Sequence, residues 1–161
     1  MLATVSDGVL RFGPHRCRAA IGSGGVSDSK QEGDGATPAG TLLLRRVLFR
    51  ADRVARPAAA VPVTLLAPND GWCDDPAHRD YNKPVSLPHE ARCEALWRDD
   101  GQYDVIGVLD WNDAPTVRGR GSAIFLHVAR PDWGPTAGCV ALSLPELLHV
   151  LRDGLTGVVV Q

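Results

Sequence analysis

Short segments rich in Val, Leu, Ile and Thr dominate the chain, and clusters of Gly and Pro separate most of them. Runs of this kind, bounded by turn-forming residues, are typical of β-strands. The pattern therefore predicts a mostly β fold. The expected strands are residues 9–12, 17–21, 41–49, 61–66, 103–110, 122–128 and 156–160.

One helix stands out near the C-terminus. Ser143 and Glu146 form a capping-box pattern, in which the Ser143 hydroxyl accepts from the Glu146 amide and the Glu146 carboxylate reaches back. Four leucines then recur at the spacing of one helical face, ending before Gly154: Leu144, Leu147, Leu148 and Leu151. Residues 90–98 are expected to form a second, shorter helix.

Residues 30–40 contain too many Gly and Pro residues for regular structure, so we expect a long connection, and long connections in compact domains are often functional. Residues 22–25, Gly-Ser-Gly-Gly, superficially resemble a phosphate-binding loop. No Gly-Lys-Ser or Gly-Lys-Thr follows a strand at the required spacing, which disfavours that function.

The length of 161 residues predicts a single domain, residues 1–161. The 17 Lys and Arg residues nearly balance the 19 Asp and Glu residues, and no block of one sign suggests a nucleic-acid partner. The longest nearly apolar stretch, residues 58–67, contains Pro62 and is too short to cross a bilayer. We therefore expect no nucleic-acid binding, no membrane insertion and a monomer.

A histidine and a cysteine lie at positions suited to nucleophilic catalysis. His127 comes near the end of a buried strand, and Cys139 follows Gly138 twelve positions later. A cysteine attacks as its thiolate, and a histidine can take the thiol proton and later return it to a leaving amine. Gly138, which lacks a Cβ atom, would let a substrate carbonyl approach backbone N–H groups near Cys139.

The spacing alone leaves a simpler interpretation open. A lone cysteine is usually a small buried apolar residue, and a lone histidine is usually a hydrogen-bonded core or surface residue. On residue types alone, His127 and Cys139 fit either interpretation.

Together with their neighbours, these residues resemble the L,D-transpeptidase family with the YkuD-type catalytic domain. The family pattern has a strand ending in His, then a loop, then Ser or Thr, His, Gly, Cys and a β-branched residue; His127, Thr136, Gly138, Cys139 and Val140 match it. Residues 35–41, Gly-Ala-Thr-Pro-Ala-Gly-Thr, resemble the family's Thr-Pro-x-Gly segment. The resemblance extends from about residue 30 to 152 and implies a sandwich-like, mostly β fold.

Two positions depart from the family pattern. Ala137 replaces a usual histidine and Ala141 a usual arginine, and the loop between His127 and Cys139 is shorter than in typical members. These losses remove groups expected to orient the donor peptide or the loop, whereas the principal base, His127, is kept. The pattern resembles a compact branch linked with 1,3 cross-links, from the first residue of the stem peptide to diaminopimelate.

The resemblance implies an acyl transfer between peptidoglycan stem peptides. The Cys139 thiolate would attack an amide carbonyl next to an L-centre, release the distal part and form a thioester, which an acceptor amine then attacks. His127 would serve both half-reactions, with its tautomer fixed by a backbone carbonyl near Val128. Carbapenem-type β-lactams are possible acylating agents, and no cofactor is expected.

Two alternatives remain open at this point: a cysteine peptidase that trims stem peptides, and a non-catalytic peptidoglycan-binding module. The resemblance implies a periplasmic or cell-envelope location. The first eight residues show no basic segment followed by an apolar run, so no export signal is visible.

Polar residues between positions 71 and 133 are candidates for substrate contact, although bracing of loop backbone or simple solvation would also explain them. An acidic side chain there could bind an acceptor ammonium, and an arginine could pair with a stem-peptide carboxylate. The candidates are Asp74, Asp75, Tyr81, Asn82, Asn112, Trp133 and Arg118, together with Thr136 of the cysteine motif.

Cys73, His78, His89 and Cys93 form a rival constellation, because two thiolates and two imidazoles can bind zinc. Their spacing is loose, and we expect no metal site. A Cys73–Cys93 disulfide in an oxidising compartment and two independent buried thiols are the other possibilities.

Overall fold

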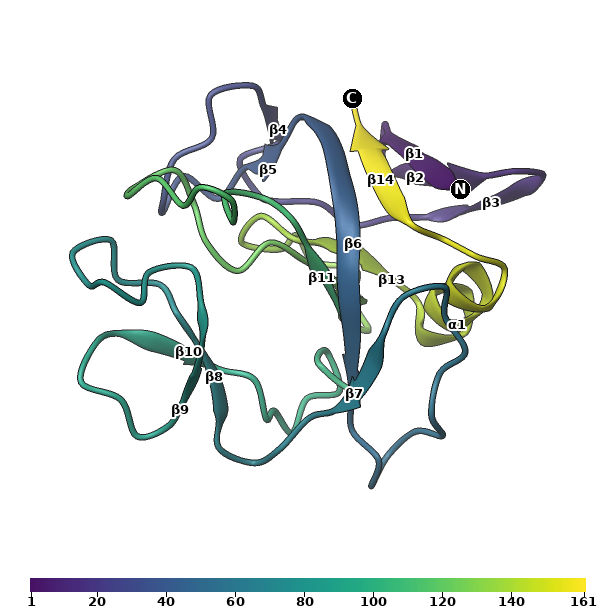
Figure 1. The fold of residues 1–161 in the computed structure, drawn as a ribbon. Helices are drawn as coiled ribbons and strands as arrows, with labels where there is room; N and C mark the ends of the chain where they lie inside the picture. The colour runs from purple at the N-terminus through teal and green to yellow at the C-terminus, as the bar shows by residue number, and fades with distance from the viewer.

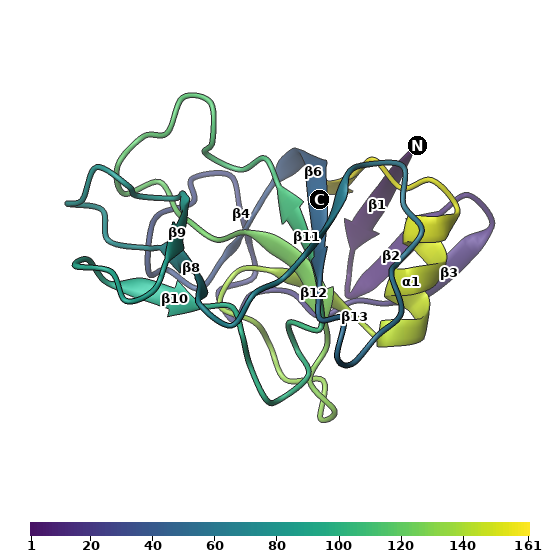
Figure 2. The ribbon, with the colours of Figure 1, turned by 60° about the horizontal axis from the view of Figure 1, so that its bottom comes forward.

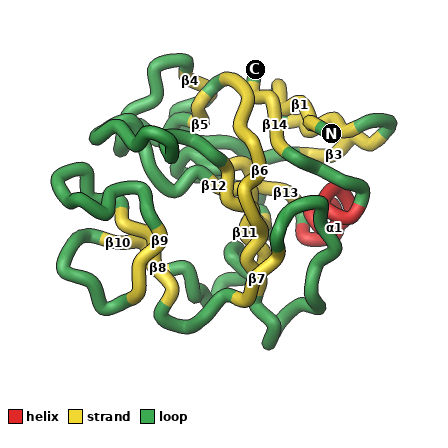
Figure 3. Tube along the Cα trace, viewed as in Figure 1, coloured by secondary structure: helices red, strands yellow, loops and turns green.

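Fourteen β-strands and one α-helix make up the regular structure of the protein, whose computed structural model describes residues 1–161 (Figure 1; Figure 3). The mostly β prediction is confirmed. The strands are β1 (Leu2–Ser6), β2 (Val9–Phe12), β3 (His15–Arg18), β4 (Val26–Ser27), β5 (Thr37–Pro38), β6 (Gly40–Phe49), β7 (Val63–Leu65), β8 (Asp70–Cys73), β9 (Pro84–Ser86), β10 (Cys93–Ala95), β11 (Val105–Leu109), β12 (Phe125–Val128), β13 (Val140–Leu142) and β14 (Gly157–Val160), and the helix is α1 (Leu144–Arg152).

A large central sheet has the strand order β13-β12-β11-β6-β14-β1-β2-β3, with β7 also paired to β6. β14 lies between β6 and β1 and runs parallel to β1, so the first and last strands of the chain are neighbours (Figure 1). A separate sheet of β10-β8-β9 lies on the side of the molecule away from α1 (Figure 2).

Six of the seven predicted strands are present, several with different bounds, and the seventh, predicted at 17–21, overlaps β3 only at Cys17 and Arg18. The segment 122–128 is extended only from Phe125, because Ala123 has a positive φ of +54° that interrupts an extended backbone. The strand predicted at 17–21 lies earlier in the chain, because β3 ends at Arg18. Beyond it, only an isolated bridge joins Ala20 to Ala141. The predicted second helix at 90–98 is wrong: Cys93–Ala95 is strand β10, paired antiparallel with β8.

Helix α1 is confirmed, and so is half of its capping box. The Ser143 hydroxyl accepts from the Glu146 amide at 3.4 Å. The Glu146 carboxylate does not reach back to Ser143; it is hydrogen-bonded to the imidazole of His15 on β3. The helix has nine residues, and the protein contains no helix long and apolar enough to span a membrane.

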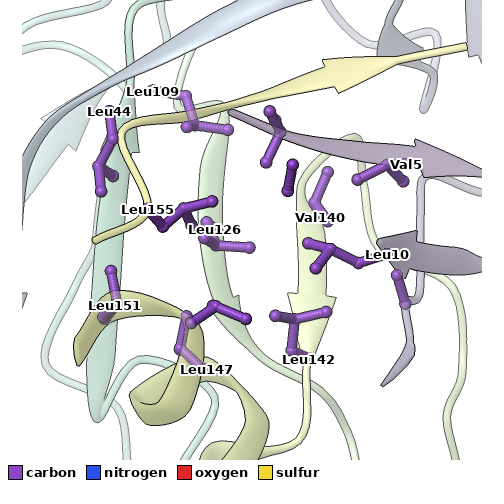
Figure 4. Packing of buried hydrophobic residues seen from close by; sticks show 14 of the residues in the cluster. Val5, Leu10, Leu44, Leu109, Leu126, Val140, Leu142, Leu147, Leu151 and Leu155 are labelled. Atoms are coloured by element: carbon purple, nitrogen blue, oxygen red, sulfur yellow. The ribbon is translucent and has the colours of Figure 1, made fainter. Parts of the chain in front are cut away.

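The central sheet carries a different hydrophobic cluster on each face. The larger cluster lies under α1, where Leu147 and Leu151 point toward Leu126 and Val140 of the sheet (Figure 4). The smaller cluster lies under the β8–β10 sheet and contains Trp72, Phe125 and Cys139. Side chains alternate between faces along a strand, so Phe125 and His127 both belong to the second face.

Candidate active site

Two adjacent parallel strands bring His127 and Cys139 to the same face of the central sheet. β12 pairs with β13 in the register Leu126–Val140 and His127–Ala141. Cys139, directly before β13, therefore lies beside Phe125, and its sulfur accepts a hydrogen bond from the Phe125 amide at 3.3 Å. His127 lies two residues further along β12, next to the small side chain of Ala141.

Both side chains line one cavity of about 300 Å³ between this face and the β8–β10 sheet. Of the residues predicted for the site, Cys139, His127, Thr136 and Asp74 lie there. Six charged side chains of both signs also reach the cavity. The full lining is Lys30, Glu32, Asp74, Glu94, Arg98, Gln102, Tyr103, Ser122, Ala123, His127, Arg130, Pro135, Thr136, Ala137 and Cys139.

The thiol of Cys139 is a neutral group in this structure. Its residue is only 7% exposed, and the Sγ–H donates to the carbonyl of Ala123 at 3.2 Å rather than to His127. Burial raises the pKa of Cys139 to about 12, and the nearby charge of Glu94 adds to that increase. The thiol is therefore protonated at neutral pH, yet it faces a cavity.

His127 is oriented by its own strand. Its Nδ1–H donates to the carbonyl of Val128 at 2.9 Å, so Nε2 carries the lone pair. Burial lowers the pKa of His127 to about 4, and the residue is 4% exposed. The ring of Tyr103 lies edge-on to the imidazole, with 5.2 Å between ring centroids. A neutral imidazole with a fixed tautomer can act as a general base toward a thiol.

A tight turn formed by residues 136–139 fixes the backbone at Cys139. Thr136 Oγ1 accepts from the Gly138 amide at 3.1 Å and donates to the Cys139 carbonyl at 2.6 Å. Gly138 has φ +140°, and a Cβ atom there would lie 2.8 Å from the carbonyl oxygen of Ala36. In this structure, the missing Cβ atom of Gly138 allows the Ala36 carbonyl of the 30–40 connection to lie close by. The Gly138 N–H donates to Thr136 Oγ1.

The pair formed by Tyr103 and Glu94 was not predicted from the sequence. The Tyr103 hydroxyl donates to the Glu94 carboxylate. Burial raises the pKa of Glu94, and the charges of Asp74 and Glu32 raise it further, while Tyr103 and Arg98 oppose the increase. Glu94 was hidden in a segment predicted as helix, and only the pairing of β10 with β8 brings it to the cavity.

Lys30 and Glu32 were also missed as individual residues, although their segment was predicted to be functional. Lys30 is buried and pairs with Asp34 at 2.5 Å. Glu32 accepts from the hydroxyls of Ser122 at 2.6 Å and Tyr81 at 2.7 Å. The Gly- and Pro-rich composition of the 30–40 connection was the signal that could have identified them.

Six predicted substrate-contact residues lie outside this cavity. Tyr81 and Asn82 are buried; Asn82 Oδ1 accepts from Trp72 Nε1 and the Ala123 amide, and its Nδ2 donates to two backbone carbonyls. Each of the remaining four side chains caps a turn, joins two loops or packs on the surface. These are Asp75, Asn112, Arg118, and Trp133, which stacks with Arg18.

Two groups of side chains offer metal-ligating atoms within 4.8 Å of one another, and neither borders the Cys139 cavity. One comprises His78, Asp80 and His89, and the other His15, Cys17 and Glu146. The first shares its two histidines with the rival zinc constellation. Both of its imidazoles, however, already use both ring nitrogens in hydrogen bonds within the protein.

Comparison with known families gives one match. The family model described as YkuD, the L,D-transpeptidase catalytic domain, matches residues 1–160. Neither curated proteins nor solved structures gave a significant match.

Proposed function

The chain belongs to the L,D-transpeptidase family with the YkuD-type catalytic domain, and on this premise we propose that it cross-links peptidoglycan stem peptides through a Cys139 thioester. The observation that carries the proposal is that Cys139 and His127 line one cavity on the same face of the sheet. A merely structural cysteine has no need of a cavity that it shares with a neutral, tautomer-fixed imidazole. Because the family acts on peptidoglycan, we also infer a location in the cell envelope.

The first half-reaction starts from a neutral thiol and a neutral imidazole. When a stem-peptide amide enters the cavity, the thiol hydrogen leaves the Ala123 carbonyl and passes to His127 Nε2 as Sγ attacks the amide carbon. The tetrahedral adduct collapses to a thioester, and the departing amine takes the proton from Nε2. Coupling proton transfer to attack avoids a free thiolate in a site where burial disfavours that charge, and the negative charge forms on the tetrahedral oxygen instead.

The second half-reaction uses the same imidazole. The acceptor amine attacks the thioester while His127 Nε2 takes its proton, and the proton then returns to the departing sulfur. The three carboxylates of Glu32, Asp74 and Glu94 in the cavity wall suit an ammonium-bearing acceptor. The cationic side chains of Lys30, Arg98 and Arg130 suit the carboxylates of a stem peptide. This mixed lining supports a zwitterionic peptide as substrate.

The proposed cross-link is of the 1,3 type, from L-Ala of the donor to diaminopimelate of the acceptor. It rests on the compact cysteine motif, with Ala137 and Ala141 in place of larger polar residues. Ala141 lies in register beside His127, so the site lacks an arginine where typical members have one.

Incubation of the protein with purified muropeptides, followed by mass analysis, tests the proposal. Dimers that appear with wild-type protein and not with Cys139→Ala support transfer. Release of a peptide beginning with D-Glu identifies position 1 as the donor, whereas release of D-Ala alone identifies position 3. Shortened monomers without dimers would make the chain a peptidase, and unchanged muropeptides would leave only a binding function.

A further inference from the structure

Two cysteines that take no part in the Cys139 cavity face each other across the small sheet. Cys73 on β8 is the register partner of Cys93 on β10. The Cys73 amide donates to Lys83 and its carbonyl accepts from the Asn82 amide, so both backbone groups point away from β10. The next pair along, Asp74 and Arg92, is joined by a backbone hydrogen bond. Cys73 and Cys93 therefore occupy a non-hydrogen-bonded position of an antiparallel pair.

Such positions hold the Cα atoms about 4.5 Å apart, the closest spacing in antiparallel sheet. Disulfides span Cα separations of about 4.4–6.8 Å. The geometry thus permits a bond with little backbone movement. The two thiols also interact in the reduced state, since the pKa of Cys93 is raised to about 11, first by burial and then by Cys73.

The two sulfurs differ in access and in neighbours. Cys73 is completely buried, whereas Cys93 is partly exposed. Cys93 Sγ lies 3.5 Å from His89 Nδ1, which also accepts from the Ala91 amide and therefore bears a lone pair. His89 can take the thiol proton of Cys93, the sulfur that an external reagent reaches first, once this lone pair releases the Ala91 amide.

A metal suits this cluster less well than a disulfide. In both His78 and His89, Nδ1 accepts a backbone N–H, and Nε2–H donates to a carboxylate of Glu90 or Asp80. Coordination through Nε2 with Nδ1 still accepting would require a doubly deprotonated ring. These contacts assign the imidazoles to the protein's own hydrogen bonds.

We propose that Cys73 and Cys93 form a cross-strand disulfide by exchange with an external disulfide, separately from the chemistry of Cys139. His89 takes the Cys93 proton, and the thiolate attacks the external disulfide, leaving a mixed disulfide; the departing sulfur takes the proton back from His89 and leaves as a thiol. The Cys73 sulfur then attacks Cys93 Sγ and passes its proton to the second departing sulfur, which also leaves as a thiol. Two thiols are oxidised and one external disulfide is reduced to two thiols.

The bond has two consequences for the fold. It closes the loop between positions 73 and 93, which carries β9 and the histidine cluster, and such closure limits the freedom of the unfolded chain. It also joins the residues directly before Asp74 and Glu94, both of which line the Cys139 cavity. Burial and the neighbouring Cys73 raise the pKa of Cys93, so no stabilised thiolate favours the reduced state.

The test is equilibration of the full chain in glutathione buffers of increasing oxidised fraction, then alkylation of free thiols in denaturant and peptide mapping. We expect a linked pair of peptides containing Cys73 and Cys93, while Cys17 and Cys139 remain alkylated. Formation of the bond should raise the unfolding temperature by about 5–10 °C. Cys73→Ser and Cys93→Ser should each abolish the linked peptides and that rise, and Cys17→Ala should abolish neither.

Three results would overturn the inference. One is alkylation of both cysteines even in the most oxidising buffer. Another is stable glutathionylation of Cys93 with Cys73 free, which would show that the second sulfur does not reach the first. The third is zinc that remains bound to purified protein and is lost in both serine variants. Each result is independent of whether Cys139 catalyses transfer.

Discussion

The thiol of Cys139 donates its hydrogen to the carbonyl of Ala123 over 3.2 Å, and it makes no hydrogen bond with His127. Ala123 is held in a positive-φ conformation, and its amide donates to Asn82 Oδ1 at 3.1 Å. The resting site is therefore a neutral thiol restrained by backbone, and the reaction begins only when the thiol hydrogen is redirected.

Alkylation of Cys139 in the free protein should be slow. With a pKa of about 12, only about one thiol in ten thousand is ionised at pH 8. The rate of iodoacetamide labelling, followed on the peptide that contains Cys139, should rise about tenfold per pH unit through pH 9. A plateau at or below pH 8 would instead indicate a preformed thiolate.

Replacing Asn82 with Ala should destabilise the fold by about 2–4 kcal/mol, because Trp72 Nε1 and the Ala123 amide would lose a buried acceptor. Urea unfolding measures the change. Lys83→Ala, at the exposed neighbouring position, is the matched control and should change stability by less than about 0.5 kcal/mol. Equal losses in the two variants would contradict the role given to Asn82.

Gly138→Ala should destabilise the fold by more than the backbone strain of a positive φ alone. The new Cβ atom would lie 2.8 Å from the Ala36 carbonyl, whereas at Gly25, with φ +74°, a Cβ meets nothing within 4 Å. We expect a loss of about 1 kcal/mol for Gly25→Ala and about 3 kcal/mol or more for Gly138→Ala. The Gly25→Ala variant should retain muropeptide transfer, and the Gly138→Ala variant should lose it. Retention of transfer in Gly138→Ala would refute the steric argument.

His127 should make the fold sensitive to acid. Its folded pKa of about 4 lies below the ordinary value of 6.5, so the unfolded chain binds the proton first as the pH falls. The neutral imidazole therefore contributes about 3 kcal/mol to the free energy of unfolding above pH 6.5. This contribution is lost as the pH falls to about 4. Unfolding free energies of wild type and His127→Gln, measured at several pH values, should show this difference. His149→Gln, at a half-exposed position in the last turn of α1, serves as the control.

Glu94→Gln should weaken acceptor binding in the proposed reaction. Removal of the carboxylate should raise the KM for the acceptor about tenfold, the loss of one charge-assisted hydrogen bond. Formation of the acyl-enzyme, followed by mass, should change much less. Glu90→Gln removes an equivalent carboxylate that binds His78 outside the cavity, and it should alter neither quantity. Parallel losses in both half-reactions would point to a general structural role for Glu94.

Local patterns in the sequence predicted the parts of the molecule that local interactions determine. The leucine stripe and Ser143 located α1, and a short apolar segment between Gly8 and Gly13 located β2 at its observed bounds. The Cys139 motif and the strand ending near His127 located two side chains of the cavity, because adjacent parallel strands align them.

The remaining features depend on contacts between distant segments. Asn82 was expected near substrate, but its four hydrogen bonds go to residues 72, 111, 112 and 123, which no local pattern reveals. β10 is short and half-polar, and it becomes a strand only because β8 supplies the partner. Glu94 reaches the cavity by the same pairing.

The placement of β14 between β6 and β1 also bears on how the protein is made. When β1 and β6 have left the ribosome, a gap of one strand still separates them, and only residues 157–160, synthesised more than a hundred positions after β6, fill it. Completion of the sheet therefore waits for that distant segment, and removal of residues 157–160 would leave two unpaired strand edges exposed to aggregation.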